Sequence, residues 1–153
     1  MNPEVQKFWN DFLVVDSSIP NDTPFQVWFF GDTVAMADSL AGLVILGRKI
    51  ATASLAAVNK IKPEVAPIPE GYSVITDFQG VPMCVIQTAE IRHLPFIEVD
   101  AQFALDEDGG DLTLEYWRGA HWRYFSREAA ELGIDFDEHS IICCERFRLL
   151  YSG

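Results

Sequence analysis

Two neighbouring strand patterns joined by one short turn constrain the fold of this chain more than any other feature. Tyr72–Phe78 and Pro82–Ile91 are rich in β-branched and apolar residues, and Gln79 and Gly80 lie between them. Glycine suits a tight turn because it adopts a positive φ without strain. The pattern therefore predicts a β-hairpin and a sheet with at least one antiparallel pair.

Helical and strand patterns follow each other along the rest of the chain without regular pairing. Apolar residues at three- and four-residue steps predict helices over 3–14, 33–46, 95–105 and 112–132. Aromatic and β-branched runs predict strands over 25–30, 50–55 and 140–151, with a loop and a short helical piece over 56–70. We expect an α+β fold, with a folded mixed sheet or small β-barrel and flanking helices, rather than a doubly wound parallel sheet.

The totals bound the class of protein. A chain of 153 residues with 49% hydrophobic residues suits one globular domain at 25–153, preceded by an N-terminal helix and linker at 1–24. The sequence lacks a membrane-length apolar run and a signal-peptide pattern, so we expect a cytoplasmic protein with no membrane partner. The net charge of −12 argues against tight binding of long nucleic acid, but it allows a nucleotide or a short single strand in a local pocket.

A lysine stands at the expected corner between a helix and a strand. The helical pattern ends near Gly47, and Lys49 then precedes Thr52 and Ser54 among small and apolar residues. A lysine beside hydroxyls can bind an anion or activate a nucleophile, whereas the residue types alone also fit a solvated lysine at a helix end. Residues three apart on a strand point to opposite faces, so Lys49 and Thr52 can meet only if Lys49 lies in the turn before the strand.

Acidic residues gather over 106–111, in what the sequence predicts to be a glycine-rich break. Carboxylates there could hold a divalent cation that activates water in a nuclease, with Glu107 and Asp111 as the candidate ligands. The spacing does not match a calcium loop, and a solvated acidic segment is the alternative. No other metal site or cofactor is expected, because the three cysteines lack the spacing of a zinc site and fit reduced core residues better.

Trp117, His121 and Tyr124 share one side of the longest predicted helix. Aromatic faces stack on nucleobases, and a histidine can bind a ligand or transfer a proton near neutral pH. An aromatic stripe at helical spacing is also typical of a core-facing surface. The sequence leaves both interpretations open.

Several ordered blocks from about residue 25 to the C-terminus form a combined pattern. The blocks are Phe30-Gly31-Asp32, Gly47-Arg48-Lys49 with Ala51-Thr52-Ala53-Ser54-Leu55, Pro95-Phe96 with Val99-Asp100-Ala101, Tyr116-Trp117-Arg118 with His121-Trp122, and Cys144-Glu145-Arg146-Phe147. Together they resemble the ASCH domain family. The resemblance implies a PUA-like fold, a small mixed β-barrel flanked by helices, and a role near RNA or modified nucleosides. An arginine is common in that family where Ser54 stands here.

The resemblance also implies a catalytic set. A bacterial amidohydrolase similar to the family removes the acetyl group of 4-acetylcytidine with a lysine, a threonine three residues later and a glutamate, to which Lys49, Thr52 and Glu107 correspond. Burial of Lys49 would favour its neutral amine, which could take the proton of Thr52. Glu107 would then polarise the substrate or protonate the leaving amine. Ser54, Trp117 and His121 are expected to bind the substrate.

Two other functions remain open at this stage. A bacterial ASCH protein of similar size and layout cuts single-stranded RNA. The resemblance to it implies a ribonuclease. Such an enzyme would use a divalent metal if it followed the nuclease chemistry described above. A non-catalytic RNA- or nucleotide-binding module would use the same pocket. The expected partners are thus an RNA-derived nucleoside or a short single-stranded RNA, with a second copy of the chain as a further candidate.

Overall fold

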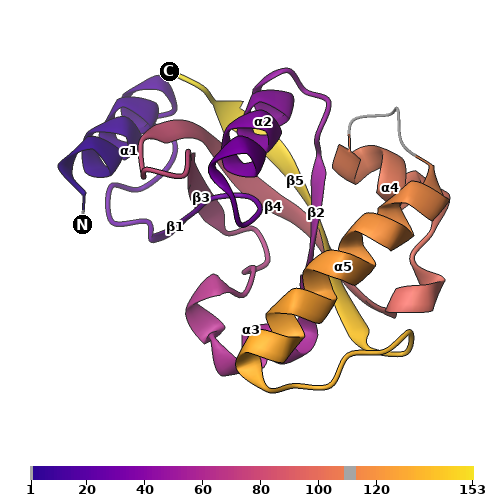
Figure 1. Ribbon diagram of the computed structural model, residues 1–153. Coiled ribbons are helices and arrows are strands. Elements are labelled where there is room, and N and C mark those ends of the chain that lie inside the picture. Colours follow the sequence, from indigo (N-terminus) through magenta and orange to yellow (C-terminus); the bar gives the residue numbers. More distant parts are fainter. Residues whose placement is uncertain (1, 109–112) are drawn as a thin grey trace.

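One mixed sheet with helices around it forms the computed structural model, which describes residues 2–108 and 113–153 (Figure 1). The helices are α1 Pro3–Val15, α2 Val34–Ile45, α3 Ala56–Ile61, α4 Ala101–Asp108 and α5 Leu114–Leu132, with 3₁₀ turns η1 Pro63–Val65 and η2 Phe96–Glu98. The strands are β1 Phe25–Trp28, β2 Ala51–Leu55, β3 Tyr72–Thr76, β4 Pro82–Pro95 and β5 Ile141–Tyr151. The predicted α+β class is confirmed.

The strands lie in the order β1-β3-β4-β5-β2. β1 pairs with β3 in parallel, and the other neighbours are antiparallel. The predicted hairpin is β3–β4, where Gly80 has a φ of 89° and the Asp77 carboxylate accepts hydrogen bonds from the N–H groups of Gln79 and Val81. The sheet is folded and mixed, as expected, but it is not closed into a barrel. β1 and β2 are its two edges.

Adjacent residues of the hairpin pack against different helices. Val74 and Val85 belong to the same apolar cluster as α1, whereas Ile75, Cys84 and Ile86 join the cluster with α2. This follows from the alternation of side chains along a strand. A third cluster joins α4 and α5 to β2 and β5 and contains Phe103, Trp117, Phe125, Leu55 and Ile142.

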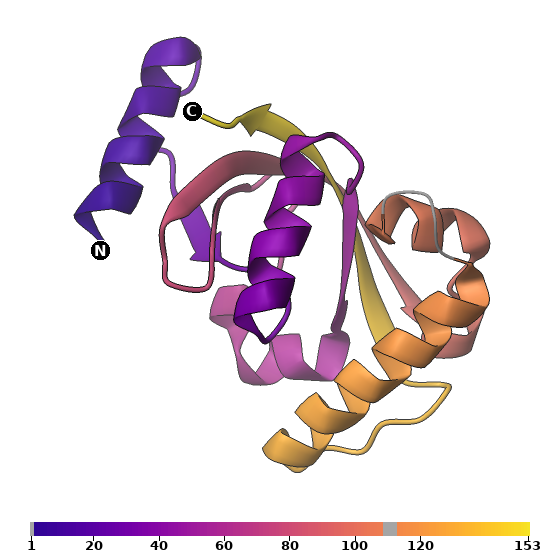
Figure 2. The ribbon, with the colours of Figure 1, turned by 45° about the horizontal axis from the view of Figure 1, so that its top comes forward.

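Helix α1 is fixed to the sheet by large apolar side chains. Asn2 caps the helix by accepting a hydrogen bond from the N–H of Glu4, and Val5, Trp9 and Phe12 are buried. The Trp9 ring stacks on Phe25 with centroids 4.4 Å apart. The two views place α1 at the end of the molecule opposite α5 (Figures 1 and 2). The N-terminal segment thus shares a core with the sheet.

The corner after α2 forms as the sequence predicts. Thr33 caps the start of the helix, and the helix ends before Gly47, which has a φ of 76°. The N–H groups of Arg48 and Lys49 both donate to the Leu43 carbonyl, at 2.9 and 3.1 Å. Lys49 therefore lies in the turn before β2, which is the condition required for it to share a site with Thr52.

The prediction of a break over 106–111 is wrong for residues 106–108, which belong to α4. Asp100 favours this helix because its carboxylate accepts a hydrogen bond from the N–H of Phe103 at 2.9 Å. Phe103, Ala104 and Glu107 are buried at helical spacing. The acidic composition left a solvated segment as the alternative, but Glu107 lies on the buried face of this helix. In the described part of the chain, no helix is long and apolar enough to cross a membrane.

Candidate functional site

A cavity of about 490 Å³ lies between α2, α3, α5 and the β2–β5 side of the sheet. Small-molecule sites commonly measure about 300–1,000 Å³. Five of the predicted site residues line this cavity: Lys49, Thr52, Ser54, Glu107 and His121. The turn after α2, the edge strand β2 and helices α4 and α5 each contribute to it, so the fold brings together residues that are far apart in the sequence.

The Lys49 side chain is buried, with 2% of its surface exposed. Its Nζ donates hydrogen bonds to the carbonyl oxygens of Ala51 at 2.7 Å and Glu107 at 3.0 Å. It also lies 4.0 Å from Glu107 Oε1 and 5.0 Å from the centre of the Phe30 ring. These contacts hold the ammonium group in place at the wall of the cavity and make it a hydrogen-bond donor there.

Glu107 covers the open edge of β2. Its Oε1 accepts a hydrogen bond from the N–H of Ala53 at 3.1 Å, and the preceding residue of α4, Asp106, accepts one from the N–H of Ile50 through its carbonyl. An edge strand has N–H groups without a strand partner, and burying them unpaired would cost free energy. Helix α4 meets this requirement and thereby carries the Glu107 carboxylate into the cavity.

The Glu107 carboxylate is ionised at neutral pH. Burial raises its pKa, but the charges of His121 and Lys49 and the hydrogen bonds from His121 and Trp117 outweigh burial and lower the pKa to about 2. A group with so low a pKa accepts hydrogen bonds and does not hold a proton for a leaving group. This electrostatic environment fits the polarising role predicted for Glu107 and does not fit the role of general acid.

His121 bridges Glu107 and its own helix. Its Nε2 lies 3.0 Å from Glu107 Oε1, and its Nδ1 lies 2.9 Å from the carbonyl oxygen of Trp117. Both oxygens are acceptors, so an imidazolium, with two N–H groups, satisfies both contacts at once. The ring also stacks on Trp117, with centroids 4.2 Å apart and an angle of 16° between the planes.

Trp117 does not offer a face to a ligand, although the sequence indicated it as a substrate-binding residue. The side chain is fully buried, and its indole N–H donates to Glu107 Oε2. Its function in the site is to orient Glu107 and to support His121. Besides His121, the aromatic side chains of α5 that line the cavity are Tyr116 and Tyr124.

The hydroxyls of β2 lie on the cavity side of the sheet. Thr52 and Ser54 both line the cavity, as residues two apart on a strand should. Ser54 Oγ accepts a hydrogen bond from Asn59 Nδ2 at 3.1 Å, which ties it to helix α3. Thr52 is therefore the hydroxyl closest in sequence to Lys49 on this wall, and Ser54 marks the α3 side of the cavity.

Glu145 is a site residue that sequence reasoning missed. It is 5% exposed, it lines the cavity, and it lies opposite Thr52 in the β2–β5 pairing. Thr88 Oγ1 donates to its Oε2 at 2.7 Å. Burial raises the pKa of Glu145, although the Thr88 hydrogen bond and the charge of Lys49 act in the opposite direction. Glu145 shares one face of β5 with Cys143 and Phe147, which are both buried. This alternation was the sequence signal that could have indicated a buried glutamate.

The predicted divalent metal stays untested, because one of its two candidate ligands lies outside the described residues. No group of three or more histidine, cysteine, aspartate or glutamate side chains that could hold a metal ion occurs among residues 2–108 and 113–153. Both oxygens of Glu107 accept hydrogen bonds from protein groups. Asp111, the other candidate ligand, lies outside the described residues.

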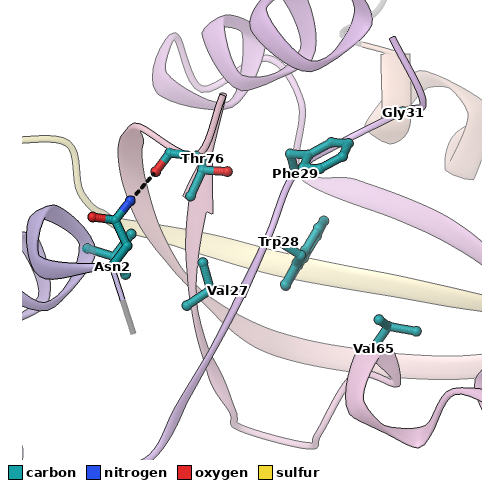
Figure 3. A pocket seen from close by; sticks show the side chains of 9 residues that line it. Asn2, Val27, Trp28, Phe29, Gly31, Val65 and Thr76 are labelled. Atoms are coloured by element: carbon teal, nitrogen blue, oxygen red, sulfur yellow. Dashed lines mark hydrogen bonds between the residues drawn. The ribbon is translucent and has the colours of Figure 1, made fainter. Parts of the chain in front are cut away.

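A second cavity of about 430 Å³ adjoins the first. Trp28, Phe29, Gly31 and Val65 line both cavities. Figure 3 shows the side chains of Trp28 and Phe29 on one wall of the second cavity and Asn2 on the opposite, α1 side. Its wall is almost wholly apolar, in contrast to the ionised wall of the first cavity.

Comparison with known proteins identifies similar sequences and structures. The family model of the ASCH domain matches residues 26–151. The chain is similar to the ASCH domain from Lactobacillus crispatus JV V101, with 30% identity, a TM-score of 0.87, and coverage of 99% of this chain and 96% of that chain. It is also similar to a protein from Enterococcus faecalis V583, with 33% identity, a TM-score of 0.88, and coverage of 99% and 91%.

A third solved structure, of a hypothetical protein, is 13% identical over 81% of this chain and 99% of that chain, with a TM-score of 0.53. At this identity it shares the fold alone. Among curated proteins, none matches the chain.

Proposed function

Because the chain belongs to the ASCH domain family, a PUA-like and RNA-related domain, we propose that it hydrolyses an amide on a modified cytidine or another RNA-derived nucleoside. Thr52 is the nucleophile in this proposal. Lys49 and His121 supply positive charge beside the acyl oxygen, and Glu107 holds both groups in place.

One observation carries the proposal: Lys49, Thr52 and Glu107 line the same cavity although they come from a turn, a strand and a helix. Positive charge fixed beside a reacting carbonyl stabilises the oxyanion that forms when a nucleophile attacks. Lys49 is held by two carbonyl oxygens and by the proximity of Glu107, so it needs no rearrangement to act in this way.

The size and chemistry of the cavity support a nucleoside rather than a long RNA. The volume of about 490 Å³ is that of a small-molecule site, and the net charge of −12 disfavours a long polyanion. Tyr116 and Tyr124 offer aromatic rings, on which nucleobases stack.

Acetate release from 4-acetylcytidine tests the proposal. The wild type should release acetate, and Thr52→Val, which replaces the hydroxyl by a methyl group of similar size, should lower kcat by at least roughly 100-fold. Thr23→Val is the matched control because it makes the same change in the linker before β1, and it should keep wild-type activity. Thr52→Ser should retain part of the activity. A wild type without acetate release, or a fully active Thr52→Val, contradicts the proposal.

A second candidate function is the cleavage of short single-stranded RNA. It is favoured by the second cavity, since four residues of its wall also line the first and an extended ligand could occupy both. Incubation of short RNA with the wild-type protein, with and without a chelator, distinguishes RNA cleavage from binding without cleavage. Cutting that the chelator abolishes supports a metal-dependent nuclease. Binding of RNA or of the nucleoside without turnover supports a non-catalytic module.

A further inference from the structure

The proposed mechanism needs a base that takes the proton from the Thr52 hydroxyl. Glu145 lies in a position to be that base. Thr52 and Glu145 are direct partners in the antiparallel β2–β5 pair. Side chains at such positions project from the same face of a sheet, with Cβ atoms about 4.5–5.5 Å apart. Both residues line the first cavity, which agrees with this orientation.

The surroundings of Glu145 hold its carboxyl group in one orientation. Thr88 Oγ1 donates to Oε2 at 2.7 Å, and among the described residues Thr88 is the only side chain that donates a hydrogen bond to this carboxyl group. The other oxygen, Oε1, can therefore accept from a second donor at the cavity wall. A carboxyl group that is 5% exposed, with one side-chain donor in the described part of the chain, is costly to bury as an anion.

The other two candidates for a base are less suited. Lys49 Nζ directs protons to the carbonyl oxygens of Ala51 and Glu107, which makes it a donor and a source of positive charge. Glu107 accepts from Ala53, Trp117 and His121, and its pKa of about 2 makes it a weak base. Burial instead raises the pKa of Glu145 towards the range in which a carboxylate accepts a proton readily.

We propose that Glu145 is the general base that accepts the proton of the Thr52 hydroxyl, an assignment that rests on the amide hydrolysis proposed above. The Thr52 O–H bond breaks as Oγ1 forms a bond to the acyl carbon, and the proton moves to the Glu145 carboxylate. The C–N bond then breaks, and the leaving amine takes this proton. Water next attacks the Thr52 ester and gives a proton to Glu145. The ester C–O bond breaks, the carboxylic acid leaves, and Glu145 returns the proton to Thr52.

Thr88 is a positioning residue in this scheme. Its hydroxyl donates to the charged form of Glu145, so it favours the carboxylate. Removing the donor should raise the pH at which the base becomes active. Among the described residues, the other charged or titratable groups that face this region are Lys49 from the turn, Cys143 on β5, Lys62 just after α3, Glu107 on α4, and His121 and Glu128 on α5, with the Tyr116 and Tyr124 hydroxyls beyond them. All of them stay constant in a comparison of variants at Thr88 and Glu145.

The pH dependence of acetate release from 4-acetylcytidine tests the assignment. Glu145→Gln keeps the shape and an acceptor for Thr88, and it should lower kcat by roughly 100-fold or more with little change in KM. Thr88→Val should shift the ascending limb of the kcat/KM profile to higher pH, whereas Thr88→Ser, which keeps the hydroxyl, should leave that limb where it is in the wild type. Glu145→Asp should restore part of the activity lost in Glu145→Gln.

The outcomes separate the two proposals. A wild type that releases no acetate overturns the proposed function and the base assignment with it. An active wild type with an equally active Glu145→Gln, or with the same ascending limb in Thr88→Val, overturns the base assignment alone. Denaturation midpoints of each variant show whether a loss of activity comes from loss of folding, and Thr88→Val gives its own result if Glu145→Gln is unstable.

Discussion

The α1 end of the molecule and the α4–α5 side are both closely packed, but with different chemistry. At the α1 end, Val5, Trp9 and Phe12 pack against the hairpin strands in an apolar cluster. On the other side, the charged groups of Lys49 and Glu107 are nearly as deeply buried as that cluster. The apolar cluster needs only area and shape, whereas each buried charge needs a partner in a fixed geometry.

This difference separates stability from function within one small domain. Apolar burial favours folding by roughly 25 cal/mol for each Å² removed from water. A buried ion pair contributes little net stability compared with apolar residues of the same volume, yet loss of one partner is costly. The ionised side therefore contributes little net stability to the fold. It lines the larger of the two cavities described above. The following predictions test this contrast, from the largest expected effect to the smallest.

Glu107→Ala should lower the free energy of unfolding by about 3–5 kcal/mol, because it removes the carboxylate beside buried Lys49 and the acceptor of the N–H groups of Ala53, Trp117 and His121. Urea denaturation near neutral pH measures this effect. Glu131→Ala, at an exposed glutamate of α5, is the matched control and should change little. A loss below about 1 kcal/mol for Glu107→Ala would mean that the ionised cluster does not support the fold.

The difference in stability between the wild type and Glu107→Gln should depend on pH. The pKa of Glu107 in the folded state, about 2, is lower than its ordinary value of 4.5, so the folded protein binds fewer protons in this range. The stabilisation is thus complete above about pH 4.5 and decreases as the pH falls towards 2, by roughly 3 kcal/mol in total. Urea midpoints between about pH 6 and pH 3 should converge for the two proteins. Parallel pH curves would contradict the assignment.

Val5→Ala should cost about 2 kcal/mol through lost burial and a cavity under α1. The cost should be the same at acidic and neutral pH, because Val5 is buried in a cluster of apolar and aromatic side chains. Denaturation curves at both pH values measure it, with exposed Val14→Ala on the same helix as the control. A pH-dependent cost would show that the two ends of the molecule are coupled.

Glu145→Gln should slightly stabilise the protein at neutral pH, by roughly 0.5–1 kcal/mol, while it lowers activity. Burial raises the pKa of Glu145, so the folded state binds the proton more tightly than the unfolded state, and stability falls as the pH rises through that window. Glutamine removes the charge and with it this cost. Thermal melting at about pH 7 measures the gain. A clear loss of stability would indicate that Glu145 supports the fold rather than the reaction.

Local patterns were enough to place most elements of this fold, although the helix predicted over 95–105 is in the structure the end of β4, the turn η2 and the first part of α4. The hairpin turn at Gly80, the helix end at Gly47 and the position of Lys49 before β2 all depend on a few neighbouring residues. The resemblance to the ASCH domain family paired Lys49 with Thr52, the spacing required Lys49 to lie before the strand, and both residues line the same cavity.

Contacts between distant segments decided the rest. The sequence named Glu107 as a candidate site residue but placed it in a break between helices, whereas α4 continues through it and buries it where the edge of β2 needs hydrogen-bond acceptors. It also could not pair Thr52 with Glu145, or place Tyr116 rather than Trp117 at the cavity, because strand register and helix rotation depend on the whole packed core. Hydrophobic pattern and turn chemistry act over a few residues, whereas the partners of buried charges are chosen only when the sheet and helices assemble.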